Sequence, residues 1–204
     1  MIHLLGKVPI KCTIAFSGGV DSVAAFDFLS NGKRDIELAF FDHGTTTSSQ
    51  AKRFVEKFAA DRGIPLKIGS LSREKNPDES LEEFWRNERY RFFHSFETAV
   101  VTAHHLDDAV ETWIFNSLHG NPRLIPHSNR NVIRPFLLTQ KSELINWCQR
   151  RKLYWIEDES NKDLRFNRNL IRHKIVPEAL KVNPGLHKTV YKKYLVLRNE
   201  DEKV

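Results

Sequence analysis

Apolar positions along the chain follow two alternating patterns. Short runs of consecutive apolar residues, each closed by glycine or polar residues, are typical of buried strands, whereas apolar residues spaced three or four apart are typical of helices. The predicted strands are residues 11–16, 36–41, 64–68, 99–103 and 132–133. The predicted helices are residues 20–30, 51–59, 80–96, 106–118 and 141–152.

This alternation predicts an α/β fold, with a parallel sheet that carries helices on both faces in a Rossmann-like arrangement. Residues 1–135 are expected to form the main α/β domain. Residues 136–204 are expected to complete that domain and to add a small basic helical extension, broken at Asn183-Pro184-Gly185. The stretches expected to be irregular are 69–79, 120–130 and 157–163.

Composition narrows the possible function classes. The chain has 204 residues, of which 40% are hydrophobic, and this suits one α/β domain with a real core. A net charge of +6 favours polyanionic partners such as nucleic acid or ATP. Cys12 and Cys148 lie far apart and outside any CxxC spacing, so neither a zinc site nor a disulfide framework is expected. No apolar stretch reaches the ~20 residues that span a bilayer, and no signal peptide is indicated, so a cytoplasmic protein without a membrane partner is expected.

The most specific motif joins the first predicted strand to the first helix and reads Ser17-Gly18-Gly19-Val20-Asp21-Ser22. Two glycines let a ligand approach the backbone amides closely, and the start of a helix offers free N–H groups with a partial positive charge. The two serine hydroxyls add further donors. Together these groups predict a phosphate-binding cradle. The loop has neither the lysine of a Walker P-loop nor the GxGxxG spacing of dinucleotide-binding loops.

A second motif follows the fourth predicted strand and reads His104-His105-Leu106-Asp107-Asp108-Ala109-Val110-Glu111-Thr112. Asp107 and Glu111 lie one helical turn apart and share a face. Carboxylates there suit a magnesium ion held together with ATP phosphates, although helix capping would also explain them. The two histidines and two aspartates of this motif also leave a metal-dependent hydrolase open.

Three polar segments are expected to meet at one edge of the sheet. Residues 17–22, 42–44 and 104–108 each follow a predicted strand. Ligands of open parallel sheets bind outside the carboxyl ends of the strands. The phosphate cradle and the acidic motif are therefore expected to lie side by side.

The phosphate loop resembles the PP-loop of the ATP pyrophosphatase superfamily, and the ordered set of motifs resembles the tRNA(Ile)-lysidine synthetase family. Beside the two motifs above, the matching segments are Asp42-His43-Gly44, Arg86-x-x-Arg89-Tyr90, Arg134-Pro135, Glu157-Asp158-x-Ser160-Asn161 and Arg168-Asn169-x-x-Arg172-x-x-x-x-Pro177. They span most of residues 11–177. The resemblance implies an adenine nucleotide alpha hydrolase-like fold and a ligase that splits ATP into AMP and pyrophosphate.

The reaction that this resemblance implies has two steps. ATP adenylates C2 of the wobble cytidine in the CAU anticodon of an isoleucine tRNA, and L-lysine then replaces AMP, so that a carbon–nitrogen bond forms. ATP and magnesium would be the cofactors, and tRNA and L-lysine the partners. The sequence does not indicate an oligomeric state.

The resemblance also implies roles for individual residues. ATP would be bound by Ser17, Gly18, Gly19, Val20, Asp21 and Ser22, and magnesium by Asp21 and Asp107. The catalytic residues would be Asp21, His104, Asp107, Asp108, Arg89 and Arg172. In the basic tail, RNA would be contacted by Arg165, Arg168 and Lys174, for which an ordinary basic helical surface is the alternative.

Two departures from the family pattern change these expectations. Ala109 stands where the family has Gln, which would alter a hydrogen bond near the base or the metal. Longer family members carry C-terminal domains that grip the tRNA, so a short form lacking them is expected. Three alternatives stay open: a PP-loop enzyme that thiolates tRNA, the metal-dependent hydrolase named above, and an RNA-binding protein without turnover.

Overall fold

A six-stranded, mostly parallel sheet forms the centre of the computed structural model, which describes residues 1–157 and 163–201, with side chains described up to residue 197. The strands are β1 Lys11–Ala15, β2 Asp35–Asp42, β3 Leu66–Ser70, β4 Ala99–Val101, β5 Ser128–Asn129 and β6 Val132–Ile133. Their order in the sheet is β3-β2-β1-β4-β6-β5. β1 pairs in parallel with both β2 and β4, whereas β5 and β6 pair antiparallel. The predicted parallel α/β fold is confirmed.

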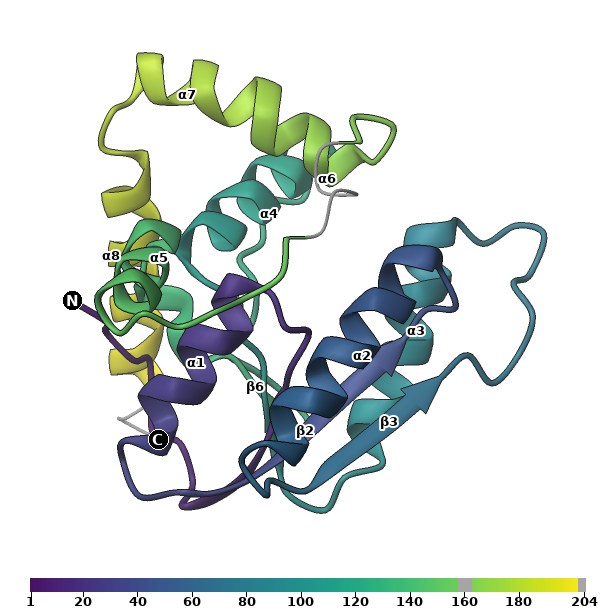
Figure 1. Cartoon of the computed structure of the whole chain (residues 1–204). Coiled ribbons are helices and arrows are strands. Elements are labelled where there is room, and N and C mark those ends of the chain that lie inside the picture. Colours follow the sequence, from purple (N-terminus) through teal and green to yellow (C-terminus); the bar gives the residue numbers. More distant parts are fainter. Residues whose placement is uncertain (158–162, 202–204) are drawn as a thin grey trace.

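Helices cover both faces of this sheet (Figure 1). They are α1 Val20–Ser30, α2 Thr46–Ala60, α3 Leu81–His94, α4 Leu106–Leu118, α5 Lys141–Arg150, α6 Asn167–Leu170, α7 Val176–Val182 and α8 Leu186–Asp201. A 3-10 turn Pro135–Leu138 precedes α5, and a π-helical turn Ile171–Ile175 joins α6 to α7. Along β2, Leu38 and Phe40 face α1 and α2 while Ala39 faces α3, because successive side chains of a strand point to opposite faces.

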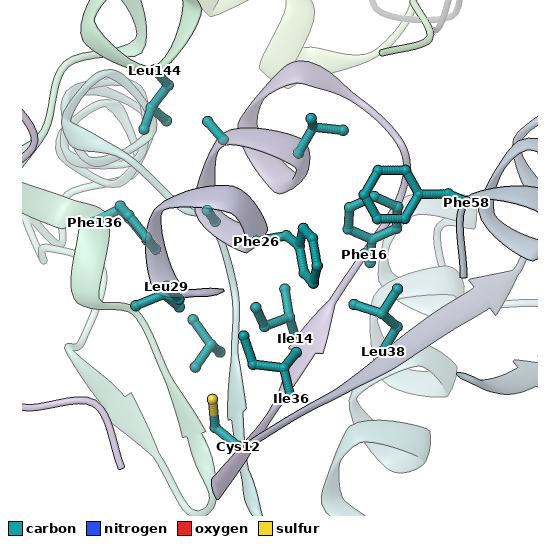
Figure 2. Close-up of a cluster of buried hydrophobic side chains, with 14 of the residues drawn as sticks. Cys12, Ile14, Phe16, Phe26, Leu29, Ile36, Leu38, Phe58, Phe136 and Leu144 are labelled. Atoms are coloured by element: carbon teal, nitrogen blue, oxygen red, sulfur yellow. The ribbon is translucent and has the colours of Figure 1, made fainter. Parts of the chain in front are cut away.

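The main core lies between β1, β2 and the helices α1 and α2 (Figure 2). Ile14 and Leu38, on neighbouring strands, are fully buried. The ring of Phe58 lies 4.6 Å from that of Phe16 and 5.2 Å from that of Phe26, measured between centroids. Burial of each such side chain contributes about 1.5–3 kcal/mol. This core fixes α1, and with it the loop that precedes α1, to the end of β1.

A second core places α4 and the C-terminal helix. Val110 of α4 packs in the same cluster as Leu186 and Val190 of α8. The hydroxyl group of Tyr194 donates a hydrogen bond to the Ile125 carbonyl oxygen at 2.8 Å. α8 is therefore part of the packed structure around α4, and its residues come close to the start of that helix.

Several boundaries differ from the sequence-based expectations. β3 begins at Leu66, two residues later than predicted, because Pro65 has no N–H for the ladder and only its carbonyl oxygen is used, by the Leu38 amide at 2.8 Å. α2 begins at Thr46 rather than near residue 51, because Thr45 and Ser48 form a capping box. The expected loop 120–130 ends in the short strand β5, which pairs with β6 across a tight turn.

The segment after α5 runs along the phosphate loop. The Ile156 amide donates a hydrogen bond to the Gly18 carbonyl oxygen at 2.9 Å. The expected polar turn 157–163 lies mostly outside the described residues, as do Asp158, Ser160 and Asn161 of the Glu157–Asn161 motif. Among the helices of the described ranges, none combines the length and the apolar character needed to cross a membrane.

Candidate functional site

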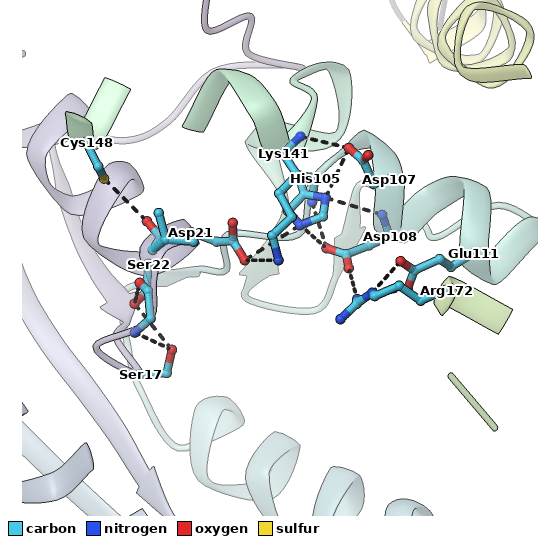
Figure 3. Close-up of polar contacts among 12 residues, drawn as sticks. Ser17, Asp21, Ser22, His105, Asp107, Asp108, Glu111, Lys141, Cys148 and Arg172 are labelled. Carbon is cyan, nitrogen blue, oxygen red and sulfur yellow. Dashed lines mark hydrogen bonds and ion pairs between the residues drawn. The ribbon is translucent and has the colours of Figure 1, made fainter. Parts of the chain in front are cut away.

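The loop between β1 and α1 folds around the hydroxyl groups of its two serines (Figure 3). Ser22 Oγ accepts a hydrogen bond from the Gly18 amide at 3.1 Å and donates to the Gly19 carbonyl oxygen at 2.9 Å. Ser17 Oγ lies 3.3 Å from Ser22 Oγ. Gly19 is the N-cap of α1 and brings no side chain to it, so the first amides of the helix, beginning at Val20, face outward as an anion-binding end.

Glycine is required at position 18 for two reasons. Its φ of +81° lies in the left-handed region that other residues rarely adopt. A Cβ atom there would come within 2.6 Å of the Phe54 ring and 3.2 Å of Ile156 Cδ1. At Gly19 the nearest heavy atom to a built Cβ is Ser17 Oγ at 3.5 Å, so the space beside that glycine is open. The loop is crowded on one side and free on the side of its serine hydroxyls.

Asp21 connects this loop to the acidic motif at the start of α4 (Figure 3). Its Oδ2 lies 3.6 Å from His105 Nε2 and 3.6 Å from Lys141 Nζ. Its Oδ1 is buried and has no hydrogen-bond partner among the described residues. Residues 17–22 and 104–108 therefore meet at the carboxyl edge of the sheet, as the order of strands and motifs predicted.

His105 is a buried cation among carboxylates. It is the N-cap of α4, and its side chain is 2% exposed. Asp21, Asp107 and Asp108 each place an oxygen within 3.6 Å of its ring nitrogens. Burial alone would lower the pKa of His105, but Asp108, Asp21 and Asp107 together raise it to about 9. The charged ring lowers the pKa of Asp107 and of Asp108 and so stabilises their ionised forms.

Asp107 is held by two elements that are distant in sequence. Its Oδ2 accepts a hydrogen bond from the Lys141 amide at 2.7 Å, at the start of α5. Its Oδ1 lies 3.2 Å from His187 Nε2 of α8. Burial would raise the pKa of Asp107, but the hydrogen bonds from His187 and the Lys141 amide lower it to about 2. The carboxylate is therefore ionised and already partnered on both oxygens.

Arg172 pairs with two carboxylates of the acidic motif, those of Glu111 and Asp108. It binds Glu111 with two hydrogen bonds, from Nε at 2.6 Å and from Nη2 at 2.9 Å, and reaches Asp108 at 3.2 Å. Such bidentate pairs fix the positions of both partners. The π-helical turn that carries Arg172 is thereby attached to α4. Asp108 contacts Arg172 through Oδ1 and His105 through Oδ2.

His104 differs from its neighbour in charge and in surroundings. Its Nδ1 lies 2.7 Å from the Thr102 hydroxyl oxygen. Burial lowers the pKa of His104 to about 3, with Arg134, Arg89 and Arg168 acting in the same direction against Asp108. The ring is therefore neutral at physiological pH, and in that state one ring nitrogen can accept a hydrogen bond.

The segment Asp42-His43-Gly44 lies at the same edge of the sheet, at the end of β2. Asp42 Oδ1 accepts hydrogen bonds from the Gly44 amide at 2.9 Å and from the Ser48 hydroxyl at 2.6 Å. The His43 ring lies 5.3 Å from that of Trp85 on α3. Through these two hydrogen bonds, Asp42 shapes the turn into α2.

The predicted basic residues divide into two groups. Arg89 and Arg168 face the same region as His104. Burial lowers the pKa of Arg89, and repulsion from Arg86 and Arg168 lowers it further. Arg165 is 89% exposed and pairs with Asp163 at 2.7 Å, and Lys174 is also exposed. The first group therefore belongs to the site, whereas Arg165 and Lys174 lie on the surface of the tail.

Magnesium fits this site through the chemistry of its donors. The unpartnered Asp21 Oδ1 is a hard oxygen ligand of the kind that the ion prefers. Magnesium usually takes one or two protein carboxylates and completes its shell with phosphate and water. Within residues 1–157 and 163–201, no three His, Cys, Asp or Glu side chains come together as a metal site of their own. Of the two expected ligands, Asp21 is better supported than the doubly bonded Asp107.

Sequence reasoning missed two residues of the site. Lys141 places its ammonium group beside Asp21 and its amide on Asp107, and His187 binds Asp107 from α8. Neither residue belongs to a recognisable motif. Both reach the site only because α5 packs on α1 and α8 packs on α4, so no local signal in the sequence would have found them.

The sequence matches a family model, and it is similar to characterised enzymes. The model is described as the PP-loop domain and matches residues 4–179. The chain is 34% identical over 199 residues to the tRNA(Ile)-lysidine synthase of Nitrosomonas europaea and 31% identical over 196 residues to that of a Thermotoga species. These matches cover 89% and 88% of this chain but 43% and 47% of the relatives. The chain thus spans about half the length of the curated relatives it matches.

Solved structures share the fold at lower sequence identity. The U34-tRNA thiolase NcsA from Methanococcus maripaludis, solved with its [4Fe-4S] cluster, superposes with a TM-score of 0.67 at 17% identity, covering 95% of this chain and 74% of that one. The NH3-dependent NAD synthetase from Campylobacter jejuni gives a TM-score of 0.51 at 15% identity, covering 93% and 85%. At these identities the likeness concerns the fold alone.

Proposed function

The chain belongs to the PP-loop domain family, and on that premise we propose that it is an ATP-dependent tRNA(Ile)-lysidine synthase. It would adenylate C2 of the wobble cytidine of an isoleucine tRNA and attach L-lysine with release of AMP. The observation that carries this proposal is the contact between Asp21 of the phosphate loop and His105 of the acidic motif, at 3.6 Å. The similarity to lysidine synthases over 89% of the chain supports the same reaction.

In the first step, the phosphate loop would bind the leaving group. The amides at the start of α1 and the hydroxyl groups of Ser17 and Ser22, whose oxygens lie 3.3 Å apart, would hold the β- and γ-phosphates of ATP. The oxygen on C2 attacks the α-phosphorus, and pyrophosphate leaves with the electrons of the broken bond. Magnesium bound at Asp21 would neutralise charge on the departing pyrophosphate.

In the second step, the acidic motif would bind the amino acid. The carboxylates of Asp108 and Glu111, which Arg172 holds in place, would bind the ammonium group, and Arg89 would supply a guanidinium group for the carboxylate. The deprotonated lysine amine attacks C2, and AMP leaves. The ring of His104, which a pKa of about 3 keeps neutral, would position the reacting groups through hydrogen bonds, and the proton that the amine loses would pass to water.

An assay of both steps tests this proposal. The full chain is incubated with ATP, magnesium, an isoleucine tRNA and L-lysine, pyrophosphate release is measured, and the nucleosides are analysed by mass. We expect lysine to be added to cytidine, and we expect Asp21→Asn to lower pyrophosphate release by about 100-fold or more, because it removes the carboxylate from the phosphate site. Unchanged cytidine together with RNA-stimulated pyrophosphate release would overturn the lysidine assignment.

A second variant, Asp61→Asn, controls for the loss of one carboxylate at a position outside the site. Asp61 forms an exposed ion pair with Lys57 at the end of α2, away from the phosphate loop. Asp61→Asn removes the same charge, and such a surface pair contributes little to stability. We expect this variant to keep the wild-type rate. Equal losses in both variants would show that Asp21 has no particular role.

The other candidate functions have less support in the structure. Cys12 and Cys148 are both buried, and burial raises the pKa of each thiol, which disfavours the thiolate needed for sulfur transfer by this chain. A hydrolase metal site at the two histidines is disfavoured because both ring nitrogens of His105 already lie against carboxylates, so neither is available to a metal ion. A binding protein without turnover would not need the phosphate loop to face the acidic motif.

A further inference from the structure

A cavity of about 330 Å³ lies beside the acidic motif, between α3, α4, α6 and the loop that precedes β5. Pockets that bind small ligands have volumes of ~300–1,000 Å³, and this cavity is at the lower end of that range. His104 and Glu111 line it, so it opens from the same region in which the two steps of the proposed reaction would take place. The proposed roles of the phosphate loop and of Asp21 make no use of this cavity.

The wall of the cavity is strongly cationic. Four arginines line it: Arg86, Arg123, Arg134 and Arg168. Glu111 is the one carboxylate among the described lining residues, and it is already bound by Arg172. None of the four arginines has an ion pair within the part of the chain that the structure describes. Guanidinium groups gathered without counter-charges favour an anionic ligand.

Two buried polar atoms in this wall lack partners. Arg134 is 1% exposed, and although it donates to the Tyr90 hydroxyl and the Pro126 carbonyl oxygen at 2.8 Å each, its Nε has no hydrogen-bond partner among the described residues. The same holds for the hydroxyl oxygen of Thr112. A buried donor without a partner is costly, so both atoms point to a ligand that supplies acceptors.

We propose that this cavity binds a phosphodiester group of the RNA acceptor, next to the nucleotide that is adenylated. The inference rests on the proposed function, since RNA is the acceptor there. The remaining wall favours a nucleotide over a free amino acid, because Phe115 offers an aromatic ring and Asn116 offers an amide to a base or ribose. The guanidinium groups of the arginines then bind the phosphate, and this contact fixes the position of the RNA chain beside His104.

Binding of a defined RNA to the full chain tests this assignment without ATP or lysine. The probe is an anticodon stem-loop of isoleucine tRNA, measured by fluorescence anisotropy over a range of salt concentrations. The variants are Arg86→Gln and Arg168→Gln, whose side chains are exposed enough to be replaced without opening a core. Each should weaken binding and reduce the slope of log K against log salt by about 0.7–0.9, because one phosphate contact is lost.

An uncharged backbone identifies the contact directly. In a second set of probes, single phosphates beside the target cytidine are replaced in turn by methylphosphonate. One replacement should weaken wild-type binding and cause no further loss in Arg168→Gln, because the variant and the probe remove the same interaction. The control is Arg150→Gln. Arg150 is an exposed residue of α5 that donates a hydrogen bond to the Asn146 carbonyl oxygen, and its replacement should keep the wild-type slope.

The outcomes separate this inference from the proposed function. Reduced slopes with no lysidine formed would support the phosphodiester site and contradict the proposed reaction. Lysidine formed with unchanged slopes would overturn the phosphodiester site alone. A raised KM for lysine with unchanged RNA binding would also overturn it, because the arginines would then bind the amino-acid carboxylate.

Discussion

At the scale of single residues, the two glycines of the phosphate loop have different roles. Gly18 is required by its φ of +81° and by the Phe54 ring against it. Gly19 has a φ of −73° and a ψ of 161°, which any residue can adopt. A methyl group at position 19 would therefore leave the backbone unchanged, and it would lie beside Ser17 Oγ, in the space proposed for phosphate.

Gly19→Ala should therefore separate ligand binding from folding. We expect the free energy of unfolding to fall by less than about 1 kcal/mol, since an N-cap glycine is only moderately better than alanine. ATP affinity, measured by calorimetry, should fall about tenfold or more because the added methyl group occupies the cradle. Gly63→Ala is the control: its φ of +61° strains the backbone and should cost stability, but nothing lies around it, so ATP affinity should stay unchanged. Unaltered ATP affinity in Gly19→Ala would mean that phosphate does not lie there.

The charge of His105 predicts how stability depends on pH. Its pKa is about 9 in the folded protein, against an ordinary value of 6.5. A raised folded-state pKa contributes stability that is fully present below pH 6.5 and is lost as the pH rises to about 9. The free energy of unfolding should fall over that range by on the order of 1–3 kcal/mol.

His105→Asn should remove most of this pH dependence. The variant is expected to be less stable than the wild type at pH 6 and to approach it above pH 9, as measured by urea unfolding at each pH. His3→Asn, at an exposed position, should leave the wild-type profile intact. A His105→Asn profile parallel to the wild type between pH 6 and 9 would contradict a charged ring.

At the scale of elements, α5 is attached to α1 by a small polar network. Asp27 of α1 accepts a hydrogen bond from Trp147 Nε1 at 2.9 Å and forms an ion pair with Arg151. This attachment holds the C-terminal half of α5, whose first residue, Lys141, lies beside Asp21 and Asp107. The network thus connects a helix–helix contact to the position of a cation in the site.

Asp27→Ala tests that connection. Loss of both interactions should lower the free energy of unfolding by about 1–3 kcal/mol, because the Trp147 N–H loses its partner. We also expect RNA-dependent AMP formation to fall several-fold, with Lys141→Met showing a similar fall without the loss of stability. Should Asp27→Ala lose stability but keep full activity, the position of Lys141 would not depend on this network.

Element boundaries could be predicted from the sequence wherever the signal is local. The predicted helix 80–96 begins at a local capping signal, since the Ser80 side chain accepts a hydrogen bond from the Glu83 amide at 3.1 Å. The start of β3 was placed too early because the apolar run includes Ile64 and Pro65, and its register depends on pairing with β2. β5 was missed because its two residues form a strand only against β6.

At the scale of the whole molecule, the topology explains which parts of the site were predictable. Parallel strands end at one edge, so the order of the motifs alone brought Asp21 and His105 together. The ion pair between Arg172 and Glu111 spans 61 residues, and the contact between His187 and Asp107 spans 80. Such contacts depend on how α6 to α8 pack on α4, which hydrophobic periodicity does not specify.

The most direct test of the central claim is to follow the α-phosphate of ATP in a single turnover. The full chain is mixed with α-labelled ATP, magnesium and isoleucine tRNA in the absence of lysine, and the label is traced. The account predicts that the label moves to the RNA as a covalent adenylate and is released as AMP when lysine is added. Label that appears in ADP, or that stays in ATP while RNA is bound, would contradict it.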